Sequence, residues 1–134
     1  HPIIVHFPQA CTVFIPVLIL GRLLFSTFGF TEGLGSAASI LAVLLPLTAV
    51  PAALAGLADA RVRFKRLTTP YLYAKMLLAG AFIVMSSIMA GMMITGNLEG
   101  WILVPFFLLN LGCALYQAFM GKIGVQLMFT VLPG

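Results

Sequence analysis

Long apolar segments separated by short polar ones make up almost the whole chain. Each apolar segment holds about 20 or more residues, the length that an α-helix needs to cross a hydrocarbon core of about 30 Å. The segments GFTEGLG, DARVRFKRLTT and TGNLEG interrupt them with glycine or charge. The pattern therefore predicts four membrane-spanning helices, over residues 2–28, 36–58, 70–95 and 101–120.

Residues typical of helix ends lie at several of these boundaries. Ser36 is a candidate N-cap, Pro70 suits a first helical position, and Trp101 stands where interfacial aromatic rings are favoured. The apolar segment 123–134 is too short to cross a bilayer. We therefore expect one four-helix transmembrane domain over residues 1–122, followed by an interfacial or partner-bound tail.

Prolines and small residues inside the predicted spans indicate how the helices pack. A proline leaves the carbonyl four residues earlier without its amide partner and bends the helix axis. Ala52, Gly56 and Ala60 recur at four-residue spacing, which lets helices approach closely. The sequence thus predicts an all-α integral membrane bundle of four helices kinked by prolines. The prolines concerned are Pro8, Pro16, Pro46, Pro51 and Pro105.

Composition and charge support a membrane protein and give its orientation. Hydrophobic residues make up 62% and charged residues 7% of the chain, whereas soluble domains carry about 25% charged residues. The net charge of +4 comes largely from the segment 59–69, beside apolar spans, which indicates membrane orientation rather than nucleic-acid binding. The positive-inside rule predicts that both termini are cytoplasmic, and the lipid bilayer is the expected partner.

Few polar residues fall within the predicted spans, and they gather toward the end with the basic segment. At 1.5 Å per residue, His6 lies about 6 to 8 Å inside the first span and Lys75 about as far inside the third. Gln117 reaches a similar depth on the fourth span, and Asp59 closes the second at the same end. Because polar groups are expensive in lipid, these residues form the candidate cofactor-binding site.

The two histidines have different expected roles. His1 and His6 are five residues apart, which separates them by about 140° on a helix, so His1 flanks the membrane and His6 is the intramembrane group. As the candidate metal ligand, His6 could hold haem iron singly or with a second ligand from Lys75, Met76, a tyrosine or a neighbouring protein. The alternative is structural, with His6 hydrogen-bonded to Asp59, a tyrosine or a carbonyl freed by proline.

Sulfur-containing residues and the scarcity of acids limit the other chemistry. Met85, Met89 and Met93 recur every four residues, but packing is favoured over Cu(I) binding because no cysteine or histidine pair lies at their level. Cys11 and Cys113 have comparable depth without the spacing of a zinc or redox motif. With three acidic residues and no nucleophile beside a base, the chain is not expected to be an enzyme. Transport would need polar groups in both leaflets, and the sequence supplies them mainly at one end.

The opening HPIIVHFPQA resembles the start of an uncharacterised prokaryotic membrane family, catalogued as domain of unknown function 2231. VPAALAGLADA, residues 50–60, is similar to the second span of that family. The resemblance covers roughly residues 1–125 and implies a four-helix domain in the prokaryotic inner membrane, with haem binding or electron transfer for some members. It implicates His1, His6 and Asp59, with haem b as candidate cofactor. Where members carry a histidine early in the third span, this chain has Lys75.

Two functional hypotheses follow. The first is a small non-catalytic accessory or structural subunit of a larger energy-transducing complex of respiratory or photosynthetic electron transfer, with other membrane subunits as partners. The second is a b-type haem or quinone-binding electron-transfer protein that uses His6 near Lys75 and Gln117. The first is favoured because the chain has no ligand pair of its own and its apolar tail suits a docked subunit.

Overall fold

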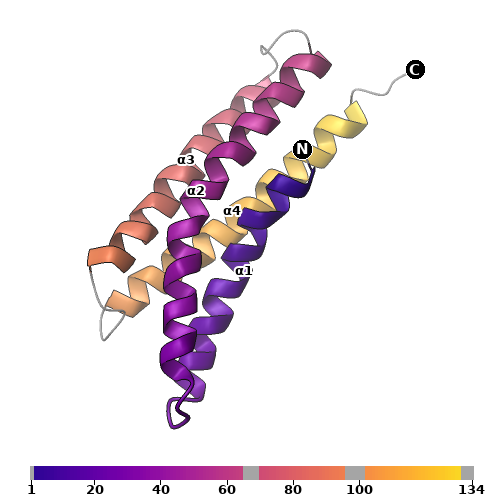
Figure 1. The fold of residues 1–134 in the computed structure, drawn as a ribbon. Helices are drawn as coiled ribbons and strands as arrows, with labels where there is room; N and C mark the ends of the chain where they lie inside the picture. The colour runs from indigo at the N-terminus through magenta and orange to yellow at the C-terminus, as the bar shows by residue number, and fades with distance from the viewer. Residues whose placement is uncertain (1, 65–69, 96–101, 131–134) are drawn as a thin grey trace.

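The computed structural model describes residues 2–64, 70–95 and 102–130 of the chain. These residues form four helices: α1 (Pro2–Leu24), α2 (Thr31–Phe64), α3 (Pro70–Thr95) and α4 (Leu103–Thr130) (Figure 1). All four contain a segment long and apolar enough to cross a membrane. The prediction of an all-α bundle with four candidate transmembrane helices is confirmed in these terms.

The helices form an up-and-down bundle in which neighbours in sequence are neighbours in space. α1 packs on α2, α2 on α3 and α3 on α4, and a smaller contact between α4 and α1 closes the ring. Within the described residues, the backbones of the diagonal pairs, α1 with α3 and α2 with α4, do not approach closely. The α1–α2 contact is the most extensive, so these two helices form a hairpin to which α3 and α4 are added.

The observed helix bounds differ from the predicted spans wherever apolar character and helical structure end at different residues. α3 has the predicted bounds, whereas α2 begins before Ser36 and continues through charged residues to Phe64. Charge ends a hydrophobic run, but arginine, alanine and aspartate do not end a helix. α4 likewise continues into the predicted tail as far as Thr130, because no proline follows until Pro133. His1, Trp101 and residues 131–134 lie outside the described residues.

Small residues on α2 form the centre of the core. Ala38, Ala42, Leu45 and Ala49 are almost fully buried, at the four- and three-residue steps that keep side chains on one helix face. Cys11 and Ile15 of α1 belong to the same buried cluster. Of the small residues singled out in the sequence, Ala60 is buried, whereas Ala52 and Gly56 are half-buried. The closest packing therefore lies nearer the α1–α2 turn than the sequence spacing indicates.

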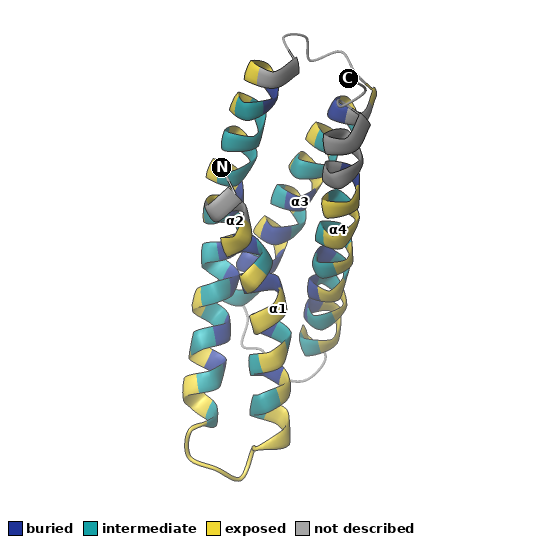
Figure 2. Cartoon of the chain, turned by 90° about the vertical axis from the view of Figure 1, so that its right-hand side faces the viewer, coloured by how far each residue is buried: buried dark blue, intermediate teal, exposed yellow. Residues whose placement is uncertain are grey.

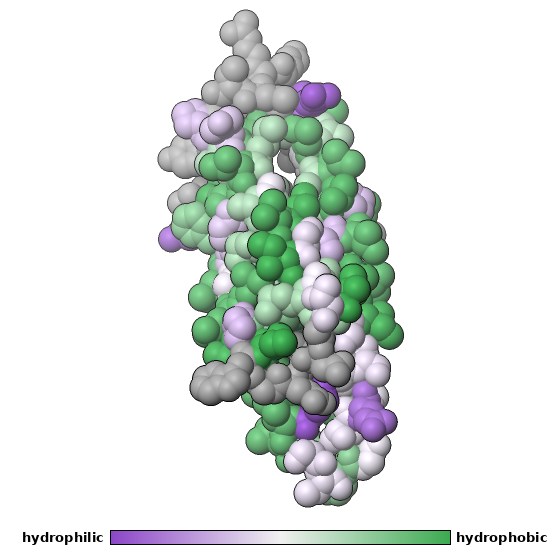
Figure 3. Space-filling view, turned by 90° about the vertical axis from the view of Figure 1, so that its left-hand side faces the viewer, coloured by the Kyte–Doolittle hydropathy of each residue, from purple (hydrophilic) through white to green (hydrophobic). Residues whose placement is uncertain are grey.

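Large apolar side chains cover the outside of every helix. Exposed residues alternate with buried ones along all four ribbons (Figure 2), and the surface of the bundle in Figure 3 is mainly apolar between hydrophilic groups toward its ends. In water such a surface would be unfavourable, whereas in a bilayer it contacts acyl chains. Together with the four apolar helices, this surface identifies a membrane protein.

Candidate functional site

The register of the α1–α2 hairpin separates His6 from Asp59. A Cβ atom built on Gly21 would lie 3.4 Å from the side chain of Leu34, so residues equally far from the turn lie side by side. By this count His6 is level with Ala49, because each lies 18 residues from the turn end of its helix. Asp59 lies ten residues beyond Ala49, about 15 Å further along the axis. The two groups do not share a level.

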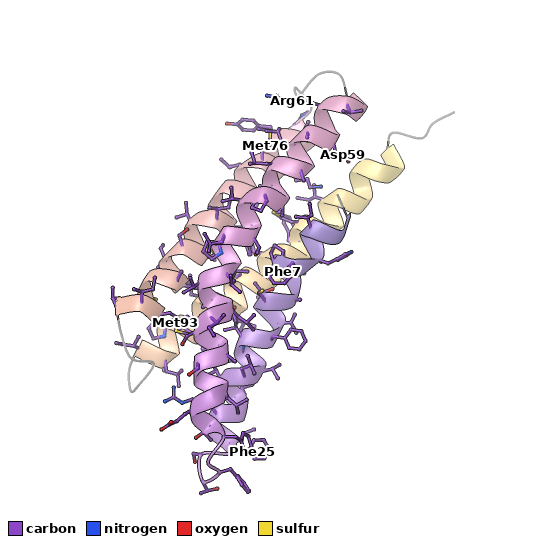
Figure 4. All side chains as sticks on the ribbon, in the orientation of Figure 1. Phe7, Phe25, Asp59, Arg61, Met76 and Met93 are labelled. Carbon is purple, nitrogen blue, oxygen red and sulfur yellow. The ribbon has the colours of Figure 1, made fainter. Side chains whose placement is uncertain are left out.

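Asp59 and Lys75 instead lie level with each other at the basic end of the bundle. Asp59 is five residues before the end of α2, and Lys75 is five residues after the start of α3. Both are half-buried, and α2 packs against α3. Figure 4 shows Asp59, Arg61 and Met76, the residue after Lys75, toward this same end. Part of the expected site is therefore an acid and a base on neighbouring helices.

A second polar group, here called the polar seam, joins α1 to α4. It consists of His6, Gln9, Thr12, Asn110 and Gln117. The Thr12 hydroxyl lies 2.9 Å from Oε1 of Gln117 and 2.8 Å from the carbonyl oxygen of Gln9, so its one proton has two acceptors. Nδ2 of Asn110 donates to the carbonyl oxygen of Thr12 at 3.4 Å. The seam thus links the first and last helices of the ring.

The bond from Asn110 has a cause in the sequence of α1. Pro16 has no amide proton, so the carbonyl four residues earlier, that of Thr12, loses its helical partner. A carbonyl without a partner is costly inside a membrane, and the fully buried amide of Asn110 supplies the missing donor. Pro105 differs from Pro16 because it lies in the first turn of α4, where no helical bond is lost.

His6 lies at the outer end of the polar seam, exposed on α1, and bonds within its own helix. Its Nδ1 is 3.0 Å from Oε1 of Gln9, one turn further along. Because an amide oxygen only accepts, this bond selects the tautomer with the proton on Nδ1 and leaves a lone pair on Nε2. Among the described residues, Nε2 has no hydrogen-bond partner. The expected partners of His6, namely Asp59, a tyrosine or a freed carbonyl, are replaced by Gln9.

These positions decide whether the candidate ligands of one chain can hold a haem inside the bundle. Gln117 is connected to His6 through Gln9 and Thr12, whereas Lys75 is level with Asp59, about 15 Å further along the bundle than His6. His6 also faces outward rather than into the bundle. The candidate ligands His6 and Lys75 therefore do not fit a haem held inside this bundle.

The sulfur atoms of the core contact one another and neighbouring hydroxyl groups. Sγ of Cys113 lies 3.8 Å from Sδ of Met89, and the Ser39 hydroxyl lies 3.8 Å from Sδ of Met93. Cys11 and Cys113 are buried free thiols. In the described ranges, no three residues of histidine, cysteine, aspartate and glutamate gather into a metal-binding group. Met89 is fully buried in the core, and Met85 and Met93 pack against the same cluster as flexible apolar side chains.

Thr12 and Asn110 are the residues that sequence reasoning missed. Both are almost completely buried, and Oδ1 of Asn110 has no hydrogen-bond partner among the residues that the structure describes. The signal for Thr12 is present in the sequence, since every intrahelical proline identifies a freed carbonyl four residues earlier. No equivalent signal identifies Asn110, because the contact depends on which helix closes the ring.

We expect the Asn110 bond to be energetically coupled to Pro16. Asn110→Ala should lower the free energy of unfolding more in the native background than in a Pro16→Ala background, because an alanine at position 16 returns an amide proton to the Thr12 carbonyl. The difference should be about 0.6 kcal/mol, the typical worth of such a bond between membrane helices. Unfolding titrations of the four variants in mixed micelles measure it. Pro46→Ala, which returns an amide proton to a different carbonyl on α2, is the control background. Equal losses in the native and Pro16→Ala backgrounds would contradict the assignment.

Comparisons of the chain with models of known protein families, with curated proteins and with solved structures found no match. The resemblance of residues 1–10 and 50–60 to a four-helix membrane family stays a prediction.

Proposed function

We propose that this protein is a small non-catalytic accessory subunit of a larger energy-transducing membrane complex of respiratory or photosynthetic electron transfer. The observation that supports it best is the outward-facing His6, held by Gln9 in one tautomer with Nε2 left for another molecule. A polar atom that faces acyl chains is costly, and a hydroxyl or amide donor from a neighbouring helix would remove that cost. His6 is then the residue through which the bundle docks against a partner subunit.

The remaining polar seam supports a structural role for the bundle. The hydrogen bond between Thr12 and Gln117 joins α1 to α4. The bond from Asn110 joins the same helices and satisfies the carbonyl freed by Pro16. Such bonds fix the arrangement of the helices, with about 0.6 kcal/mol as a typical contribution in a membrane. A bundle stabilised in this way presents a defined apolar surface to its neighbours.

The proposal includes an orientation. Arg61 is exposed near the end of α2, and Arg63, Lys65 and Arg66 follow it in the sequence. By the positive-inside rule this end faces the cytoplasm. The first residues of α1 and the last of α4 lie toward the same end (Figure 1). We therefore propose that both termini are cytoplasmic, in the inner membrane of a prokaryote.

Purification from the native membrane tests the accessory role. In mild detergent the tagged chain should co-purify with subunits that carry haem or iron–sulfur absorbance. His6→Phe keeps an aromatic ring but removes the hydrogen bond, and should weaken this association about tenfold. Phe14→Leu, on an exposed position of the same helix, should leave it unchanged. A chain that purifies alone, or a His6→Phe variant that stays fully associated, would overturn the proposal.

A second candidate function uses the same atom of His6. A histidine with its proton on Nδ1 can bind a metal through Nε2, and the bond from Nδ1 to Gln9 holds the ring in the orientation that such a ligand needs. A b-type haem or a quinone would then lie between His6 and a partner chain, and would supply one-electron chemistry when bound. A reduced-minus-oxidised spectrum of the complex should show a haem α-band that is lost in His6→Phe and retained in Lys75→Met. A flat spectrum, or a band indifferent to His6, would refute the haem form.

A further inference from the structure

Three phenylalanines in the turn between α1 and α2 form an exposed aromatic cluster. The ring centroids of Phe25, Phe28 and Phe30 lie 5.9 to 6.2 Å apart, which is the range of attractive aromatic pairs. Each side chain is nevertheless about half exposed, at 47%, 56% and 56%. The rings hold one another in place, and the described part of the chain does not cover them.

This aromatic turn projects beyond the neighbouring end of α3. Ser39 contacts Met93, yet Ser39 lies eight residues into α2 and Met93 only two residues before the end of α3. The start of α2 therefore lies about six residues, or about 9 Å, beyond the last residue of α3. Figures 1 and 4 show the turn, with Phe25, at the tip of the hairpin.

α2 is too long to lie wholly within the hydrocarbon core of a bilayer. Its apolar segment Thr31–Val62 has 32 residues, about 48 Å at 1.5 Å per residue. Even a tilt of about 40° reduces its span to about 37 Å, whereas the hydrocarbon core measures about 30 Å. At least one end of α2 must reach the headgroup region, and the turn before Thr31 is at one of its two ends.

The surface around the turn joins the lipid-facing surface of α1. Leu20, Leu23 and Leu24 are exposed and lead directly to Phe25, with Leu24 at 76% exposure. Arg22, in the last turn of α1, and Glu32, in the first turn of α2, add charge at the same level. Apolar rings beside charged groups are typical of segments that lie at the boundary between headgroups and acyl chains.

We propose that the aromatic turn inserts into the headgroup–acyl boundary of the leaflet opposite the basic end, and anchors the α1–α2 hairpin at a fixed depth. The occupant of this surface is lipid. The continuity of the turn with the lipid-facing leucines of α1 supports this occupant.

Depth-dependent fluorescence quenching tests the anchor. Trp101 is the sole tryptophan, so Phe28→Trp in a Trp101→Phe background gives one reporter in the turn. Leu115→Trp in the same background, at a 66% exposed position near the middle of α4, reports the hydrocarbon core. Both proteins are reconstituted into phosphatidylcholine vesicles that carry bromine either near the headgroup or near the acyl-chain end.

The turn reporter should emit at short wavelength and lose most intensity with bromine near the headgroup, whereas the α4 reporter should lose most with bromine deep in the chain. Aqueous iodide should quench neither strongly. Strong iodide quenching of the turn reporter would mean that the turn lies in water. Protection from every quencher would mean that protein covers it, and strongest quenching by deep bromine would mean that it lies within the hydrocarbon. Each of these results overturns the proposal.

Discussion

Replacing Ala42 by leucine is expected to lower the free energy of unfolding by about 3 kcal/mol, because the new side chain would force α1 away from α2. Ala42 is 0% exposed and belongs to the core cluster with Cys11 and Ile15 of α1. In a membrane, helix pairs are held mainly by close packing, since acyl chains are as apolar as leucine. A wedge at this position therefore removes contacts without a hydrophobic gain in return.

Ala58→Leu is the matched control for this expectation. Ala58 is an exposed alanine of the same helix, so its replacement adds the same volume where the helix faces outward. Unfolding titrations in mixed micelles should show little change for Ala58→Leu and a clear loss for Ala42→Leu. Equal stability of the two variants would show that the α1–α2 interface has room for a larger residue and that its packing is looser than the burial of Ala42 indicates.

The sequence predicts the four spans well because each depends on a local property. Apolar length alone identifies the candidate transmembrane helices, and α3 has the bounds that the pattern predicts. The predicted boundaries are wrong where the apolar run and the helix end at different residues. Residues 25–28 continue the apolar run of the first span although the backbone has already left α1 at Leu24. Asp59 ends an apolar run although α2 continues to Phe64.

The candidate site is predicted less well than the spans. Sequence alone gives the depth of a site residue in the membrane only as a count of residues from the end of its own helix. That count places His6, Lys75 and Gln117 at one level, but it assumes that all helices begin at the same height. In the structure α2 extends beyond the start of α1, so Asp59 and Lys75 lie further out than His6. The stagger depends on how whole helices pack, and no local pattern in the sequence encodes it.

The polar seam also shows which part of a site follows from chemistry alone. A proline within a helix requires a donor for one particular carbonyl, so Pro16 identifies Thr12 in advance. The identity of the donor, Asn110, follows from the closure of the ring by α4. A close reading of prolines in membrane helices therefore predicts where a polar contact is needed, and the fold decides which residue provides it.

Phe106→Ala is expected to lower the free energy of unfolding by about 2 kcal/mol, less than the roughly 3 to 5 kcal/mol that such a change costs in a soluble core. Phe106 is 0% exposed and occupies the same face of α4 as Asn110 and Cys113, at four- and three-residue steps. In a soluble protein the loss contains a transfer term and a cavity term. Here the unfolded reference also lies in lipid, so the transfer term largely cancels and the lost packing remains.

Phe119→Ala separates these two contributions on the same helix. Phe119 is 55% exposed on the outside of α4, so its side chain contacts lipid in both the folded and the unfolded state. Its truncation leaves no enclosed cavity, because lipid fills the space. Its effect in the same mixed-micelle titration should be within about 0.5 kcal/mol of zero. A loss at Phe119 as large as that at Phe106 would mean that the outer face of α4 is itself packed against protein. That result would assign α4, rather than the His6 face of α1, as the side of the bundle that meets a partner.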